Sequence, residues 1–310
     1  MITRPGSRDS ELMTAGKTGF TRPIAITLLG LMTACSQASD STTRAGVGRF
    51  ALDAESLQQW KLPKRLNEIS GLALTPDDRL FAIGDEEAII YELDHQQARI
   101  VKAFALGDPT IRGDFEGIAY LNDAFYLVTS NGRLYATAEG NDGDRMQYKT
   151  YKTGLGKRCE IEGLAQDVKT NVLMLACKES KLKGEDPTLS VFVWSPSMRK
   201  FLDEREIAIP VGDIAEKLDK KRISLSGIAV DPVTASLYAV AARQRAIIEM
   251  KPNGELIDAI ILPLADRHRQ AEGIEITRGG ELLIADEGGN KKARLSVYAS
   301  GHEKTTDRQE

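Results

Sequence analysis

The chain has 310 residues, a formal net charge of −4 and 42% hydrophobic residues. This composition provides a core for one or two globular domains and argues against disorder. The slightly acidic balance gives no support for a nucleic-acid partner, which requires a concentrated basic surface. The chain has only three cysteines and three histidines. A structural zinc site takes four ligands of these types, so the composition argues against one.

Residues 1–34 have the pattern of a lipoprotein signal peptide. Four basic residues, the last of them Arg22, precede an apolar run over 23–34 that is shorter than the about 20 residues of a membrane-spanning helix. The run ends in Leu-Met-Thr-Ala-Cys, which resembles the bacterial lipobox. We therefore expect cleavage before Cys35 and lipidation of this cysteine. An uncleaved membrane anchor is the alternative.

After Cys35, residues 35–50 are small and polar and are expected to form a flexible tether. Ser36 takes the place of an aspartate after the cysteine, which by resemblance to enterobacterial sorting favours the outer membrane over the inner one. The folded domain would then lie in the periplasm, with the membrane as a partner through the lipid anchor. We expect a β-propeller over 51–300 and a disordered tail over 301–310.

A short motif of the form Glu/Ser-Gly-Leu/Ile, followed by alanine in four of its copies, recurs five times in the folded part. Its glycines are Gly71, Gly117, Gly163, Gly227 and Gly273, and three of the four steps between them are equal. Each motif is followed by further strand-like runs, so one unit has the dimensions of a four-stranded propeller blade. The long step, from 163 to 227, is expected to hold an insertion over 180–187 and 211–221, the latter a short helix.

The fifth unit lacks its fourth strand. Residues 56–62, upstream of the first motif, form a strand-like run of suitable length. We expect this run to complete the last blade and close the ring, which removes the unpaired edges of an open one. The prediction is an all-β, five-bladed propeller of four-stranded blades; six blades, with a degenerate copy in 201–225, is the alternative.

Acidic residues gather just before the repeated glycines, where the innermost strands of a propeller line its central channel. Crowded carboxylates repel one another unless a cation is present, and calcium prefers six to eight oxygen ligands. Calcium is therefore the expected cofactor, with plain salt bridging as the alternative. The expected metal ligands are Glu116, Glu162, Glu272, Asp114, Glu160 and Glu68.

One arginine per unit stands four to six residues before the glycine. These arginines are Arg65, Arg112, Arg158, Arg222 and Arg269. They are expected either to bridge to acids of neighbouring blades or to form a rim that binds an anion through bidentate contacts. A small anionic ligand and a protein partner both stay open.

Cys159 and Cys177 are expected to form a disulfide. A hairpin that pairs Ala165 with Asn171 also places these two cysteines opposite each other on adjacent strands. Export to an oxidising compartment permits the bond. A thiol-based active site is the alternative.

Signals for catalysis are few. His268 is the only histidine expected near the acidic face, and a loop histidine of this kind is more often solvated than catalytic. No Gly-x-Ser-x-Gly or P-loop pattern is present. No residue is therefore predicted to be catalytic, and the sequence inclines against an enzyme without deciding the matter.

The ordered set of motifs resembles the SdiA-regulated, YjiK-like family of exported β-propeller proteins. The resemblance extends over about 60–298 and rests on seven segments: 69–72, 84–86, 90–94, 114–120, 162–164, 225–228 and 285–287. It implies an envelope-associated propeller with a link to calcium. Related propellers include phytase-like and lactonase-like enzymes, some with calcium near the channel.

We therefore expect an envelope-anchored lipoprotein propeller that serves as a calcium-binding sensing or binding module. A calcium-dependent hydrolase, phytase-like or lactonase-like, is one alternative. A scaffold propeller without metal, held together by salt bridges, is the other.

Overall fold

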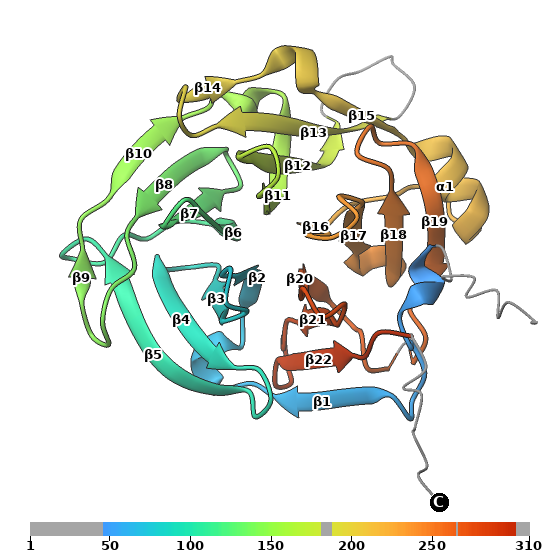
Figure 1. The fold of residues 1–310 in the computed structure, drawn as a ribbon, viewed down its shortest axis with the longest axis horizontal. Coiled ribbons are helices and arrows are strands. Elements are labelled where there is room, and N and C mark those ends of the chain that lie inside the picture. The colour runs from blue at the N-terminus through green and yellow to red at the C-terminus, as the bar shows by residue number, and fades with distance from the viewer. Residues whose placement is uncertain (1–45, 181–187, 265, 302–310) are drawn as a thin grey trace, which may run out of the picture. The chain divides into compact units, whose positions relative to one another are not determined.

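The computed structural model describes residues 46–180, 188–264 and 266–301. Within these residues, five small sheets surround a central channel and form a five-bladed β-propeller (Figure 1). The predicted fold class and blade number are confirmed. The expected signal peptide, Cys35 and the tail beyond Gly301 lie outside the described residues, as do 181–187 of the expected insertion.

Each blade begins with a strand beside the channel and adds strands outward, mostly antiparallel. Blade 1 consists of β2 (Ile69–Leu74), β3 (Leu80–Gly84), β4 (Ile89–Asp94) and β5 (Arg99–Leu106). Blade 2 consists of β6 (Phe115–Leu121), β7 (Ala124–Thr129), β8 (Arg133–Thr137) and β10 (Lys149–Lys152). Blade 3 consists of β11 (Cys159–Asp167), β12 (Val172–Ser180), β13 (Thr188–Ser195), β14 (Lys200–Phe201) and β15 (Ile207–Pro210).

The last two blades follow the same plan. Blade 4 consists of β16 (Gly227–Val230), β17 (Leu237–Ala241), β18 (Ala246–Met250) and β19 (Leu256–Ile261). Blade 5 consists of β20 (Ala271–Ile276), β21 (Leu282–Asp286), β22 (Arg294–Tyr298) and β1 (Leu57–Lys61). A two-residue strand, β9 (Arg145–Met146), crosses from the blade 2 sequence to pair in parallel with β5 of blade 1.

The ring closes between the two ends of the described chain. Strand β1 pairs antiparallel with β22, from Leu57 opposite Tyr298 to Lys61 opposite Arg294. The expectation that an N-terminal strand completes the last blade is confirmed. A further bridge between Phe50 and Ser300 extends this closure.

The propeller begins earlier than the sequence indicated. Residues 46–50 fall in the range expected to be a tether, yet Val47–Arg49 form a 3₁₀ helix and Val47 is fully buried. The guanidinium of Arg49 makes an ion pair with Asp231 of blade 4 at 2.6 Å. By composition, the small and polar residues of this segment indicate a linker. In the structure, the burial of Val47 and the ion pair of Arg49 hold the segment against the blades.

Packing between blades explains the repeated glycines. The buried apolar side chains of the described residues form five clusters, each between two neighbouring blades. At the channel the innermost strands approach closely: a Cβ added to Gly117 of blade 2 would lie 2.6 Å from the backbone nitrogen of Leu164 in blade 3. A side chain at this position would push neighbouring blades apart.

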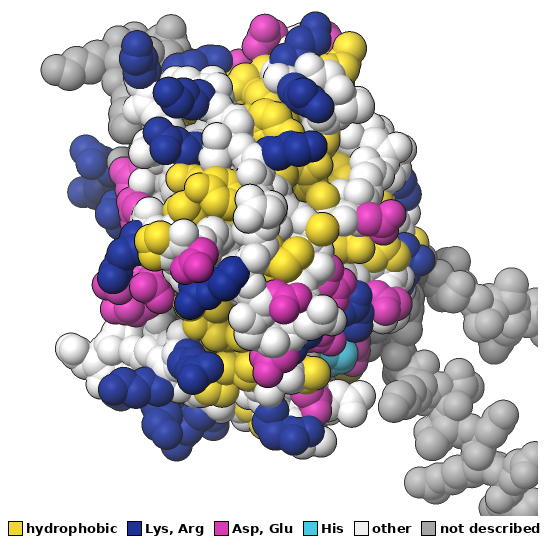
Figure 2. Space-filling model, turned by 90° about the vertical axis from the view of Figure 1, so that its left-hand side faces the viewer, with side chains coloured by type: hydrophobic (Ala, Val, Ile, Leu, Met, Phe, Trp, Pro, Cys, Tyr) yellow, Lys and Arg dark blue, Asp and Glu magenta, His cyan; other side chains and the backbone are white. Residues whose placement is uncertain are grey.

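The long step between the third and fourth motifs contains the expected helix. Helix α1 (Val211–Leu218) buries Val211, Ile214 and Leu218, three positions on one helical face, in the cluster between blades 3 and 4. No helix among the described residues is long and apolar enough to cross a membrane. On the side of β5, β9 and β10, Figure 2 shows basic and acidic side chains intermingled with small hydrophobic areas.

Candidate functional site at the two mouths of the channel

Three glutamates converge at one mouth of the central channel. Glu116 lies on β6, Glu162 on β11 and Glu272 on β20, the innermost strands of three different blades. Each lies where the pairing with the second strand shifts by a β-bulge. A bulge adds an unpaired residue and re-aims its side chain, which lets an acidic residue of a buried strand face the channel.

Burial and mutual repulsion raise the pKa values of these carboxyls. Burial raises the pKa of Glu116 to about 9, and the carboxylates of Glu162, Asp114 and Glu272 add to the effect. Burial likewise raises the pKa of Glu272 to about 8, with Glu162 as the next cause. A cation placed here would favour the ionised forms.

Lys178, at the end of the second strand of blade 3, supplies positive charge at this mouth. Its ammonium group donates to Glu162 and, at 3.2 Å, to Glu160. Burial raises the pKa of Glu162, but this contact opposes the shift and leaves the pKa at about 7. The pKa of Lys178 itself is raised by the two glutamates against the opposing effect of burial.

The other predicted acids lie further out on the same face. Asp114 is exposed and accepts a hydrogen bond from the hydroxyl of Ser130 at 2.5 Å. Glu68 is exposed and lies near Asp85, whose pKa is raised by burial and then by Glu68. Burial and Asp85 also raise the pKa of Glu287. The acidic mouth therefore extends over four of the five blades.

As arranged, the carboxylates do not form a finished metal centre. Within the part of the chain that the structure describes, no three or more His, Cys, Asp or Glu side chains are grouped closely enough to hold a metal ion. The equivalent positions of the two remaining blades carry serines: Ser70 lies at the bulge of β2, and Ser226 directly precedes β16. Ser226 is satisfied by the carbonyl of Ala271 at 2.6 Å, whereas the buried hydroxyl of Ser70 has no hydrogen-bond partner among the described residues.

The five predicted arginines do not form one continuous ring. Arg112 makes ion pairs with Glu86 at 3.1 Å and Glu87 at 3.6 Å, both in blade 1, and so links two blades. Arg158 pairs with Glu206 of its own blade at 3.1 Å. The other three are exposed and make no ion pair with a described residue: Arg65, Arg222 and Arg269.

A disulfide joins Cys159 and Cys177, with a Cα–Cα distance of 5.7 Å. The predicted register is wrong: Ala165 pairs with Met174 rather than Asn171, because β12 begins only at Val172. A bulge in β11 then places Cys177 opposite Ile161, so the two cysteines bond diagonally across the strand pair. The bond lies beside Glu160, Glu162 and Lys178 in sequence.

His268 is not the solvated loop residue that the sequence suggested. It is 1% exposed and lies 2.8 Å from a carboxylate oxygen of Asp286 and 2.6 Å from the hydroxyl of Tyr298. The carboxylate only accepts, so Nδ1 carries the proton and in the neutral ring Nε2 accepts from Tyr298. All three groups are buried, so this hydrogen-bonded cluster has a structural role within blade 5.

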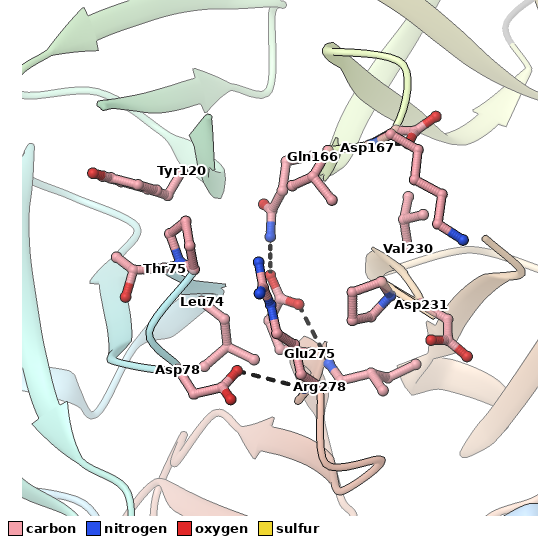
Figure 3. Close-up of a pocket in the computed structure, with 15 residues that line it drawn as sticks. Leu74, Thr75, Asp78, Tyr120, Gln166, Asp167, Val230, Asp231, Glu275 and Arg278 are labelled. Carbon is pink, nitrogen blue, oxygen red and sulfur yellow. Dashed lines mark hydrogen bonds between the residues drawn. The ribbon is translucent and has the colours of Figure 1, made fainter. Parts of the chain in front are cut away.

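The opposite mouth of the channel holds a pocket that was not predicted from the sequence. It is lined by residues of all five blades, near the turns that leave the innermost strands (Figure 3). Glu275 of β20, 3% exposed, accepts hydrogen bonds from the Gln166 side-chain amide at 3.1 Å and from the backbone of Ile276 at 3.3 Å. Burial raises the pKa of Glu275 to about 8.

A sequence signal for this pocket existed. The second position after the glycine is alanine in four copies of the motif, at Ala73, Ala119, Ala165 and Ala229, but it is Glu275 in the fifth. A carboxyl at a position that is otherwise apolar and buried indicates a special local role.

The comparisons with known proteins agree with the fold. A model of the SdiA-regulated family matches residues 205–308, so the resemblance found from the sequence is confirmed over this part of the chain. The structure is similar to glutaminyl cyclase from Myxococcus xanthus, with a TM-score of 0.52 and 14% identity over 78% of this chain and 93% of that one.

The structure is also similar to the PQQ-bound aldose sugar dehydrogenase from Streptomyces coelicolor, with a TM-score of 0.46 and 14% identity over 78% of this chain and 98% of that one. At such low identity, the likeness to the cyclase shows the propeller fold alone. No curated protein sequence matches the chain.

Proposed function

We propose that this chain is a lipid-anchored propeller of the cell envelope that binds calcium at the acidic mouth of its channel and acts as a sensing or binding module. The observation that carries the proposal is the convergence of Glu116, Glu162 and Glu272 from three blades. Their raised pKa values mark a place where positive charge would relieve repulsion.

The residues at this mouth have the chemistry that calcium prefers, namely carboxylate oxygens from several flexible side chains. Glu116 and Glu272 would contribute oxygens from opposite sides of the channel, and Glu162 would exchange its contact with Lys178 for one with the ion. Side-chain rotation would have to bring these groups closer than they stand, because no three of the described acids are grouped for a metal as arranged.

Calorimetric titration of the purified full chain with calcium tests the proposal. We expect saturable binding, a rise in melting temperature with calcium, and tighter binding at pH 9 than at pH 6, because calcium and protons compete for the same carboxyls. Glu116→Gln and Glu272→Gln should each weaken binding at least tenfold. The matched control is Glu249→Gln, a buried glutamate on β18 that is 5% exposed and lies on a strand away from the channel.

Absence of binding at millimolar calcium would refute the calcium site. In that case the scaffold alternative is favoured, in which salt bridges alone neutralise the acids, as Lys178 does with Glu162 and Glu160. The anchor is tested separately: radiolabelled fatty acid should be incorporated into the full chain in cells and not into the Cys35→Ala variant.

A further inference from the structure

The pocket at the other mouth of the channel is separate from the acidic mouth. Its cavity volume is about 40 Å³, and the space between its lining residues is about 520 Å³ when open solvent is included. Glu275 and Glu272 lie on the same strand, yet only Glu275 lines this pocket, while Glu272 lines the narrow part of the channel. A ligand here would therefore be bound independently of calcium.

The floor of the pocket offers hydrogen-bond acceptors that are incompletely used. The carboxyl of Glu275 makes no ion pair with any described residue, although it is 3% exposed. The side-chain carbonyl oxygen of Gln166 is buried and has no hydrogen-bond partner in the described part of the chain. Figure 3 shows the amide of Gln166 directed toward Glu275 across the pocket.

A buried carboxyl and an unpartnered carbonyl oxygen together favour a ligand that brings both positive charge and several N–H donors. Burying either group without a partner is costly, so a donor that satisfies both is stabilised. A primary ammonium group, with three N–H donors and a full charge, meets this requirement.

Two basic side chains, Arg278 and Lys169, lie at the opening of the pocket, beside the carboxylate of Asp78. Arg278 is exposed, and its backbone N–H donates to the carboxylate of Asp78 at 3.4 Å. Its guanidinium makes no ion pair with a described residue. Lys169, also at the opening, donates to the backbone carbonyl of Val233 at 2.6 Å. These two cations can attract the acid group of a ligand whose amine lies deeper.

We propose that this pocket binds a small zwitterion of the amino-acid class. Its ammonium group contacts the carboxyl of Glu275 and the free carbonyl oxygen of Gln166. Its carboxylate faces the guanidinium of Arg278 at the opening, where bidentate pairing is available.

The test is calorimetry and thermal unfolding of the full chain with a panel of L-amino acids, each accompanied by the amine without the carboxylate and the acid without the amine. At least one amino acid should bind saturably and should bind at least tenfold more tightly than its two fragments. Glu275→Gln should weaken this binding at least tenfold, and Arg278→Gln about three- to tenfold.

Glu249→Gln serves again as the control, because it removes a buried carboxyl outside both mouths. It should bind the amino acid as the unmodified chain does. Calcium affinity should be unchanged in Arg278→Gln, which shows that the variant is folded and that the two sites are distinct. The proposal would be overturned if no amino acid binds at about 10 mM. It would also be overturned if Glu275→Gln binds the amino acid with the same affinity as the unmodified chain.

Discussion

The carboxyl of Glu116 couples the stability of the ring to pH. Burial raises its pKa to about 9 in the folded chain, compared with 4.5 for a solvated glutamate. Between these values the unfolded chain loses the proton while the folded chain keeps it. Stability therefore falls as pH rises through this window and levels off above it, which is opposite to the behaviour of a salt-bridged carboxylate.

Glu116→Gln removes this dependence, since an amide does not ionise. In calcium-free buffer we expect the variant to lose less stability than the unmodified chain between pH 6 and pH 9, by roughly 1–2 kcal/mol after allowance for solvent screening. Urea unfolding at the two pH values measures the difference. Glu204→Gln, at an exposed position, is the control and should follow the unmodified chain. If the free energy of unfolding of Glu116→Gln falls between pH 6 and pH 9 as much as that of the unmodified chain, the carboxyl titrates as a solvated group.

The buried tie between His268, Asp286 and Tyr298 predicts a second effect at the residue scale. Tyr298→Phe keeps the aromatic ring of the side chain but removes the hydroxyl that lies 2.6 Å from Nε2 of His268. The histidine nitrogen is then buried without a partner, which costs about 1–3 kcal/mol. Denaturant unfolding should report this loss. A change below 0.5 kcal/mol would indicate that water replaces the hydroxyl.

The acidic mouth was predictable from the sequence because the glutamates that form it precede the regularly spaced glycines. It could not show that Glu116, Glu162 and Glu272 are bulge residues, since a bulge depends on how two strands pair. The environment of His268 was missed for a related reason: its partners, Asp286 and Tyr298, belong to later strands.

At the element scale, strands were predictable and their register was not. Alternating and apolar runs located β11 and β12, but the turn between them was placed too early, so Ala165 was expected opposite Asn171 instead of Met174. Residues 145–152 of the blade 2 sequence divide between β9 and β10, which pair with different blades. Local sequence carries little information about which neighbouring sheet accepts such a short segment.

The disulfide joins the two innermost strands of blade 3, across a sequence separation of 18 residues. In the chain-entropy model, a loop of this size restricts the unfolded chain by about 3 kcal/mol. The double variant Cys159→Ala, Cys177→Ala is expected to lose about 2–4 kcal/mol of unfolding free energy under oxidising conditions. Reducing agent should bring the unmodified chain close to the variant and leave the variant unchanged. An unmodified chain that is insensitive to reductant would contradict this stabilising role.

At the scale of the whole molecule, the spacing of five glycines was enough to predict the number of blades. Equal steps reveal equal units, and the missing strand of the last unit revealed where the ring closes. The contribution of residues 46–50 was not predictable, because their composition is that of a linker. Their place is determined by contacts with distant residues, such as the ion pair of Arg49 with Asp231.

Closure by β1 is the feature on which the integrity of the ring depends most directly. Strand β1 covers the edge of β22, Leu57 packs against the cluster between blades 4 and 5, and Trp60 packs against that between blades 5 and 1. Removal of residues 1–62 exposes this edge and uncovers both clusters. We expect the shortened chain to aggregate or to unfold without a cooperative transition.

Removal of residues 1–41 is the matched control, because β1 and the segment from Val47 stay in place, and its melting temperature should remain within a few degrees of that of the full chain. A synthetic peptide of residues 46–62 added during refolding should restore cooperative unfolding to the chain that lacks residues 1–62, since it supplies the missing strand in trans. Rescue by the peptide assigns the defect to ring closure. A cooperative transition in the shortened chain without the peptide would show that four covered blades and an open fifth are stable on their own.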